Sequence, residues 1–135
     1  MKELKIKALV ENLEQVLAFL DAELEEMDCD IKIQMQMDIA VEEMFVNIAS
    51  YAYENGTGDA TIQISGYDNP DRVEITFIDN GIPYDPLAKE DPDITLSAEE
   101  REIGGLGIFM VKKSMDDMIY ERQGDKNVLK IVKNL

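Results

Sequence analysis

Glu43 and Asn47 are the residues whose types and spacing most directly suggest chemistry. They lie four residues apart in a segment with helical periodicity, so they are about 40° apart around the helix axis and away from Val41, Met44 and Ile48. The amide oxygen of Asn47 suits a Mg²⁺ ion that already carries water and phosphate oxygens, and the carboxylate of Glu43 can accept a proton from a nucleophile. Taken alone, the pair is more typical of two polar residues on a solvated helix face.

A second candidate follows a predicted strand at residues 73–78, where Asp79, Asn80 and Gly81 occur in succession. A carboxylate at the end of a strand can accept a hydrogen bond from an exocyclic amine such as that of adenine. A glycine two residues later lets the backbone approach a planar ligand, because glycine has no side chain. The alternative is an ordinary turn, of which this residue combination is more typical when nothing else is considered.

Gly104, Gly105, Leu106 and Gly107 form the third candidate. They precede a predicted helix at residues 107–115, and the unpaired N–H groups at the start of a helix can bind phosphate. The alternative role for these glycines is that of a loop hinge.

Alternating and helical patterns predict the elements that position these motifs. Residues 2–8 alternate polar and apolar side chains, as a half-buried strand does. Asp30 can cap a helix that contains Glu43 and Asn47 and continues to about Glu54. Before it, apolar residues at steps of three and four predict a helix at residues 10–27 with the buried row Val10, Leu13, Leu17, Leu20, Leu24 and Met27.

The remaining elements complete an α/β (α+β) domain. We expect antiparallel strands at 61–65 and 73–78, a mobile acidic lid loop at 83–103 with at most a short helix at 97–101, and a closing hairpin at 118–122 and 128–132. This order favours a two-layer sandwich, in which helices cover one face of a mostly antiparallel mixed sheet. The 135 residues fit one domain, spanning residues 1–135.

Composition excludes several classes of function. The net charge of -16 repels nucleic acid and anionic membrane surfaces, although an acidic face also suits a basic protein partner. The chain contains no histidine and only one cysteine, Cys29, so it lacks the residues for Ser-His-Asp or Cys-His catalysis and for a cysteine-based zinc site. Any metal ion must therefore be bound by oxygen atoms. The charged N-terminus does not resemble a signal region, and we expect a cytoplasmic protein.

Together and in this order, the three motifs resemble those of the Bergerat-fold (GHKL) ATPase superfamily of gyrase, chaperone, histidine-kinase and mismatch-repair ATP-binding domains. Glu43 and Asn47 resemble its N box, residues 79–81 its first glycine box and residues 105–107 its second. Segments 41–49, 79–86 and 104–112 look most like the anti-sigma-factor serine kinases, which have a histidine-kinase-like ATP-binding domain. One departure is Tyr51, where that family often has histidine.

The resemblance implies that this chain binds ATP and Mg²⁺. Asn47 would then hold the metal ion, and Glu43 would assist the attacking hydroxyl. The residues implied to bind the nucleotide are Asn47, Asp79, Gly81, Arg101, Gly104, Gly105, Leu106 and Gly107. For Arg101, a surface ion pair within the acidic loop is the alternative.

The resemblance also implies a protein-serine kinase that phosphorylates an anti-anti-sigma (STAS-domain) partner, binds a sigma factor and forms a homodimer. One alternative is a nucleotide-regulated binding module without significant kinase activity. Another is a detached histidine-kinase ATP-binding domain, whose histidine would come from a partner protein.

Overall fold

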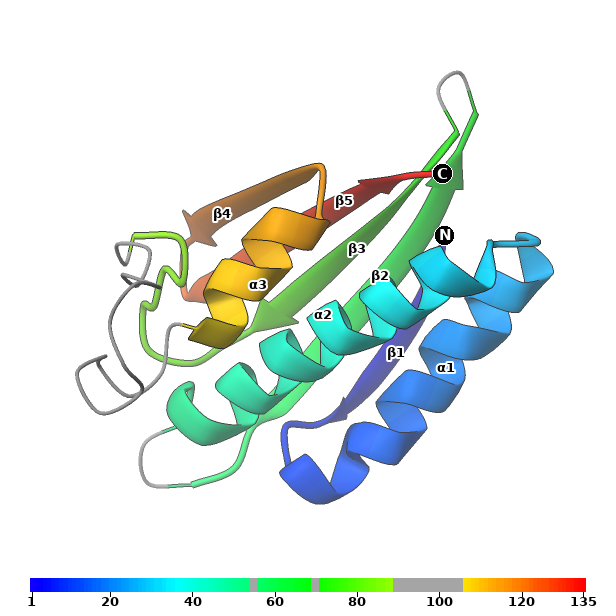
Figure 1. Cartoon of the computed structure of the whole chain (residues 1–135). Helices are drawn as coiled ribbons and strands as arrows, with labels where there is room; N and C mark the ends of the chain where they lie inside the picture. The colour runs from blue at the N-terminus through cyan, green and yellow to red at the C-terminus, as the bar shows by residue number, and fades with distance from the viewer. Residues whose placement is uncertain (54–55, 69–70, 89–105) are drawn as a thin grey trace.

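The computed structural model describes residues 1–53, 56–68, 71–88 and 106–135, and within them it has a five-stranded sheet (Figure 1). The strands are β1 (Lys2–Lys7), β2 (Asp59–Tyr67), β3 (Arg72–Asp79), β4 (Asp117–Gln123) and β5 (Lys126–Asn134). Their spatial order is β1-β2-β3-β5-β4, and each neighbouring pair is antiparallel. β5 therefore lies between β3 and β4. Its first residues pair with the last residues of β3, so that Asn127 is opposite Asp79.

The α-helices of the described residues cover one face of this sheet, as Figure 1 shows. They are α1 (Leu13–Glu26), α2 (Ile31–Tyr51) and α3 (Leu106–Ser114), and α2 lies between the other two. The predicted two-layer α/β sandwich is thus confirmed, with every described strand pair antiparallel. No helix in the described part of the chain has both the length and the apolar character that crossing a bilayer requires.

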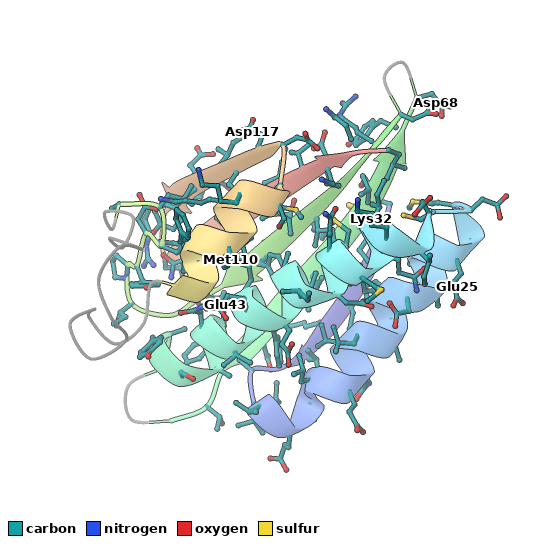
Figure 2. The ribbon with its side chains drawn as sticks, viewed as in Figure 1. Glu25, Lys32, Glu43, Asp68, Met110 and Asp117 are labelled. Carbon is teal, nitrogen blue, oxygen red and sulfur yellow. The ribbon has the colours of Figure 1, made fainter. Side chains whose placement is uncertain are left out.

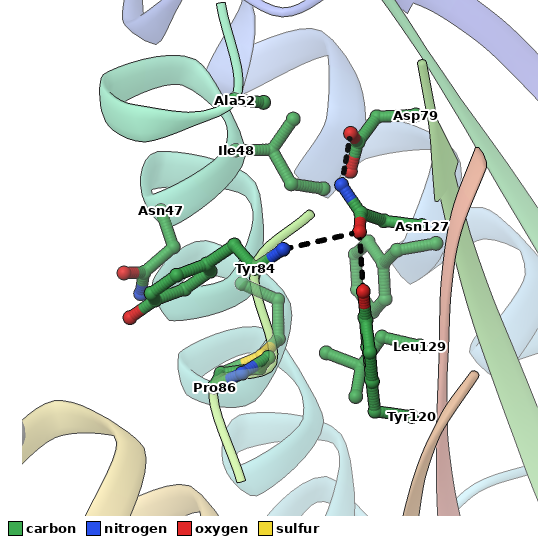
Figure 3. A pocket seen from close by; sticks show the side chains of 11 residues that line it. Asn47, Ile48, Ala52, Asp79, Tyr84, Pro86, Tyr120, Asn127 and Leu129 are labelled. Atoms are coloured by element: carbon green, nitrogen blue, oxygen red, sulfur yellow. Dashed lines mark hydrogen bonds between the residues drawn. The ribbon is translucent and has the colours of Figure 1, made fainter. Parts of the chain in front are cut away.

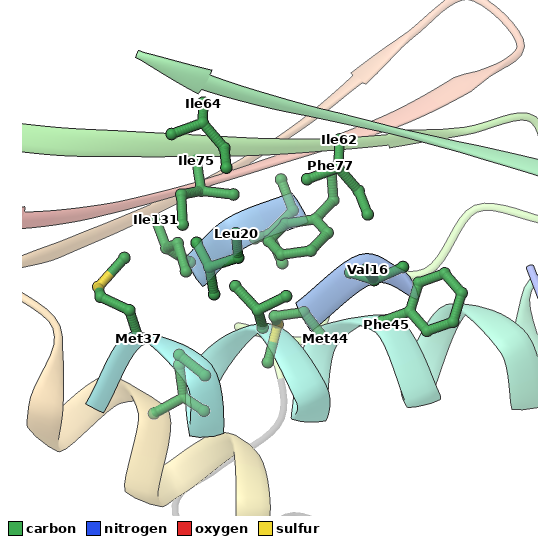
Figure 4. Close-up of a cluster of buried hydrophobic side chains, with 14 of the residues drawn as sticks. Val16, Leu20, Met37, Met44, Phe45, Ile62, Ile64, Ile75, Phe77 and Ile131 are labelled. Carbon is green, nitrogen blue, oxygen red and sulfur yellow. The ribbon is translucent and has the colours of Figure 1, made fainter. Parts of the chain in front are cut away.

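Alternating strand residues and the inward faces of α1 and α2 meet in one core (Figure 4). Its largest fully buried side chains include Phe45 from α2 and Phe77 from β3. The prediction that Val10 belongs to the buried row is wrong, because residues 10–12 form a short 3-10 helix and α1 begins only at Leu13. Val10 is 54% exposed, and the fully buried residues of α1 are Val16, Leu20 and Leu24.

The start of α2 agrees with the predicted cap. Asp30 accepts a hydrogen bond through Oδ1 from the backbone N–H of Lys32 at 2.8 Å, which satisfies one of the free N–H groups in the first turn. The helix ends at Tyr51, earlier than predicted, and the predicted end at Glu54 lies outside the described residues. Residues 89–103 of the expected lid loop, with the short helix expected at 97–101, also lie outside them.

A pair of carboxyl groups lies where α1 packs against α2. Asp21 accepts a hydrogen bond from Gln34 Nε2 at 3.2 Å, and Asp38 faces the same carboxylate. One oxygen of Asp38 is buried and has no hydrogen-bond partner in the described part of the chain. Burial, together with the hydrogen bond and negative charge of Asp21, raises the pKa of Asp38 from 3.8 to about 7. The folded protein therefore favours a proton on this pair near neutral pH.

This raised pKa predicts a pH-dependent loss of stability. Between about pH 4 and about pH 7 the unfolded chain has released the Asp38 proton while the folded chain retains it, so the free energy of unfolding falls as the pH rises. Asp38→Asn should abolish this contribution and stabilise the protein at pH 8. We expect a gain on the order of 1 kcal/mol, because solvent screens a carboxyl group that is only partly buried.

Urea unfolding of the wild type and Asp38→Asn at several pH values between 4 and 8 measures the effect. Glu42→Gln is the matched control, because Glu42 lies one turn further along α2 and is exposed; its stability difference from wild type should change little with pH. A difference between wild type and Asp38→Asn that stays constant across this range would contradict the shared-proton account.

Candidate functional site

Glu43 and Asn47 meet on the side of α2 that faces α3. The amide nitrogen of Asn47 donates to Glu43 Oε1 at 3.1 Å and to the Glu43 backbone carbonyl at 2.8 Å. The structure therefore brings the two residues together as the sequence predicts. Because Nδ2 makes both bonds, the amide oxygen of Asn47 is the atom that remains to bind a metal ion.

Asp79 is the last residue of β3 and is only 5% exposed. Its Oδ1 accepts hydrogen bonds from the backbone N–H of Gly81 and from Asn127 Nδ2, both at 2.9 Å. These two donors hold the carboxylate in one orientation. Among the described residues no other group donates to Asp79, so its second oxygen, Oδ2, can accept a hydrogen bond from a ligand.

Asn127 is a site residue that the sequence analysis missed. It lies opposite Asp79 in the β3–β5 register, is 6% exposed, and donates to the Ile82 carbonyl at 2.7 Å as well as to Asp79. Its amide oxygen accepts from the Tyr120 hydroxyl at 2.5 Å and from the Tyr84 N–H at 3.3 Å.

The strand pattern predicted at residues 128–132 could have revealed this residue. If the alternation is continued back by one residue, Asn127 falls on the core face, where a side-chain amide needs hydrogen-bond partners. That signal was available in the sequence.

Gly81 serves a close backbone contact. A Cβ at this position would overlap the carbonyl of Ala52 at the end of α2, and the neighbouring Ile82 N–H donates to that same carbonyl at 3.0 Å. Arg122 of β4, also missed by the sequence analysis, donates from Nη1 to the Gly81 carbonyl at 2.8 Å. The turn after Asp79 is therefore fixed between α2 and β4. The sequence-based reason for this glycine was a close approach to a ligand, whereas the structure shows a close approach to Ala52.

A cavity opens beside Asp79, between α2 and the inner face of the sheet (Figure 3). Its walls are largely apolar, with the carboxylate and amide of Asp79 and Asn127 on one side. The lining residues are Met44, Asn47, Ile48, Ala52, Phe77, Asp79, Tyr84, Pro86, Tyr120, Asn127 and Leu129. An apolar slot with one oriented acceptor suits a planar heterocycle that carries an amine.

The described part of the third motif, Leu106 and Gly107, lies at the start of α3, where Gly107 is close to Glu43 of the first motif. Leu106 is the first residue of that helix, and a Cβ on Gly107 would overlap the Glu43 carboxylate where it now lies, so a larger residue would displace this side chain. Figure 2 shows Glu43 beside the beginning of α3. The positive end of the helix dipole favours a negative group here. Arg101, Gly104 and Gly105 lie outside the described residues.

Two tyrosine rings lie beside this region. Tyr51 and Tyr84 have ring centroids 6.2 Å apart with an interplanar angle of 37°. Burial raises the pKa of Tyr84, and the nearby Tyr51, Glu43 and Asp85 raise it further. Tyr84 therefore remains a neutral hydrogen-bonding group close to Glu43.

The donor set fits a magnesium ion that arrives with phosphate. Within the described residues no three histidine, cysteine, aspartate or glutamate side chains gather to form a metal site. Mg²⁺ commonly takes only one or two protein oxygens and completes its six ligands with water and phosphate. The amide oxygen of Asn47, next to the Glu43 carboxylate, could be one of these protein oxygens.

The chain has relatives among bacterial serine-protein kinases. It is 36% identical over 86 residues to the serine-protein kinase RsbW of Bacillus cereus strain B4264, and 35% identical over 86 residues to that of Bacillus anthracis. These matches cover 61% of this chain and 52% of each relative. The chain thus spans about half the length of the curated relatives it matches.

Two solved structures have a similar fold. The RsbU and RsbW domains of Rv1364c from Mycobacterium tuberculosis match 98% of this chain and 32% of that chain, with a TM-score of 0.62 and 14% identity. The histidine kinase domain from the blue-light activated histidine kinase EL346 of Erythrobacter litoralis matches 93% of this chain and 60% of that chain, with a TM-score of 0.60 and 15% identity.

The family described as histidine kinase-like ATPase domain matches residues 6–133, nearly the whole chain, and this range includes the three sequence motifs. This protein therefore belongs to the histidine kinase-like ATPase domain family.

Proposed function

We propose that this protein binds Mg-ATP with adenine in the cavity beside Asp79. The observation that carries the proposal is the buried pair of Asp79 and Asn127, which leaves one oriented carboxylate oxygen facing an apolar slot. The exocyclic amine of adenine is a donor that this oxygen can accept. Glu43 and Asn47 both lie on α2, and Glu43 is close to the start of α3. The phosphates of the bound nucleotide would extend toward this region.

The roles of the individual residues follow from their chemistry. The amide oxygen of Asn47 would hold Mg²⁺, which neutralises charge on the phosphates when bound. Gly81 would keep the turn after Asp79 close to α2, and so keep the adenine acceptor in place. The segment with Arg101, Gly104, Gly105, Leu106 and Gly107 would approach the phosphates, with free N–H groups at the start of α3 directed at them.

We infer that the bound nucleotide serves protein-serine phosphorylation. The serine oxygen would form a bond to the γ-phosphorus as the bond to the bridging oxygen of ADP breaks, and Glu43 would accept the hydroxyl proton. Most of the rate enhancement would come from positioning and charge stabilisation. Similarity to serine-protein kinase RsbW supports this reaction.

We also infer from this similarity that the phosphate acceptor is a serine-bearing anti-anti-sigma (STAS-domain) protein. The chain would then be a cytoplasmic regulator of the anti-sigma type. It would form a homodimer and bind a sigma factor. A nucleotide-regulated binding module without significant transfer is the competing function. Mass spectrometry of a STAS protein after incubation with Mg-ATP distinguishes the two, because only the kinase leaves a phosphoserine.

The adenine assignment predicts a preference for ATP over GTP. A ligand that binds only the folded state stabilises it by about 2.7 kcal/mol at a concentration about a hundredfold above its dissociation constant. Mg-ATP should therefore raise the melting temperature. Mg-GTP should do so far less, because guanine presents a carbonyl where adenine presents an amine. Asp79→Asn should weaken ATP binding by about 1–3 kcal/mol, the cost of a mispaired buried polar group.

Thermal unfolding with each nucleotide, together with calorimetric titration, measures both effects. Asn80→Asp is a matched control, because Asn80 is the exposed neighbour of Asp79 and does not line the cavity. Equal stabilisation by ATP and GTP would show that Asp79 does not read the base.

The different roles of Glu43 and Asn47 predict different defects. Glu43→Gln removes the proton acceptor but preserves size and hydrogen bonding, so it should retain Mg-ATP binding while phosphate transfer to a STAS protein falls by about 10²–10⁴-fold. Asn47→Ala should lose the metal ion and most of the nucleotide affinity. Titration with Mg-ATP and the transfer rate separate these outcomes.

Glu42→Gln is the control for this pair. Glu42 is exposed and lies about 100° around the helix from Glu43, so its variant should transfer phosphate like the wild type. An inactive Glu42→Gln with an active Glu43→Gln would shift the catalytic assignment by one residue. If both variants transferred phosphate at the wild-type rate, neither glutamate would act as the general base.

A further inference from the structure

The outward face of α2 carries a row of large apolar side chains on its N-terminal half. Ile31, Met35 and Ile39 are 68%, 59% and 61% exposed, and we call them the α2 stripe. They are spaced four residues apart, so they follow one another along a single side of the helix. Single exposed apolar residues are common on protein surfaces, whereas a contiguous row of them marks an interaction site.

The fold itself gives no reason for this row. The core contacts of α2 are made by another face of the helix, where Met37, Val41 and Phe45 are fully buried. α1 and α3 flank α2 without covering the stripe, since its side chains stay more than half exposed. Its apolar surface therefore remains available to a partner.

Acidic residues lie along one side of the α2 stripe, although two of them, Asp38 and Asp21, favour a shared proton near neutral pH. Glu42 lies about 20° around the helix from Met35 and Asp38 about 60° from it, so both are on the same side of α2. Asp21 of α1 reaches this side through its hydrogen bond with Gln34. From residue 13 to residue 51 the chain has ten acidic residues and only one basic one, Lys32, which lies toward the N-terminal end of the stripe (Figure 2).

This charge identifies the kind of occupant. A second copy of the chain would bring the same acidic face, and an anionic bilayer or nucleic acid would also be repelled. We propose that the α2 stripe docks an amphipathic helix of a partner protein, with its apolar row on Ile31, Met35 and Ile39 and its flanking lysines or arginines beside the acids. In this type of recognition, apolar side chains spaced three and four residues apart on one helix pack against an apolar surface of the partner.

The proposal is independent of nucleotide binding. The α2 stripe occupies the N-terminal half of α2, whereas Glu43 and Asn47 lie in the C-terminal half and face α3. A failure of the peptide test below would therefore leave the ATP site untouched. Loss of ATP binding would likewise leave the docking surface intact.

A labelled peptide probe tests the proposal. We would use a helix of about 18 residues with leucines at every third and fourth position and lysines on the flanks, long enough to run beside the whole stripe. Fluorescence anisotropy should show binding that weakens as sodium chloride rises from about 50 mM to about 500 mM, because salt screens the acidic rim. The same peptide with glutamate in place of lysine should not bind.

Variants locate the binding surface. The triple variant Ile31→Ser, Met35→Ser and Ile39→Ser should weaken binding by at least about tenfold, as loss of central apolar anchors does. Ile119→Ser is the matched control, because Ile119 is 48% exposed but projects from β4 on the sheet face opposite the helices. It should bind the peptide like the wild type. Both variants should keep the wild-type melting temperature, since the changed side chains are exposed.

Three outcomes would overturn the proposal. Unchanged peptide binding by the triple variant would show that the acids alone attract the peptide. Equal binding of the glutamate peptide would remove the electrostatic argument. Sedimentation that shows a wild-type dimer dispersed by the triple variant would identify a second copy of the chain as the occupant.

Discussion

A buried carboxylate at the end of β3 is the constraint on which the site depends. Asp79 is 5% exposed, and a buried charge is costly unless hydrogen bonds compensate for lost water. Gly81 and Asn127 provide those bonds to one oxygen. Asn127 can do so only because β5 pairs with β3 in a register that places it opposite Asp79. The acceptor that is left for a ligand is therefore a consequence of sheet order, and Arg122 and Ala52 fix the turn that follows.

The helix α2 connects this constraint to the rest of the molecule. One face buries Met37, Val41 and Phe45 in the core, so its position relative to the sheet is determined by packing. That position carries Glu43 and Asn47 toward α3, where Gly107 permits close approach. Its end provides the carbonyl of Ala52 that holds the turn after Asp79. One helix thus positions groups at two ends of the cavity, while its outward face remains available for another interaction.

Much of this arrangement could be predicted from local patterns. Alternation predicted the strands, and helical spacing predicted that Glu43 and Asn47 would meet. Val10 was assigned wrongly because apolar spacing alone does not reveal that a short 3-10 turn precedes the helix. The partnership of Asp79 and Asn127 joins residues 48 positions apart and depends on β5 lying between β3 and β4. No local pattern specifies that order, although an amide on a core-facing strand position indicates a buried polar contact.

The most direct test is a crystal structure of the protein with Mg²⁺ and a non-hydrolysable ATP analogue. The central claim is that Asp79, oriented by Asn127, accepts a hydrogen bond from adenine. We expect the adenine amine within hydrogen-bonding distance of Asp79 Oδ2, with the bond from Asn127 to Oδ1 retained and the metal ion on the amide oxygen of Asn47. Adenine bound outside this cavity, or bound within it without contact to Asp79, would contradict the account.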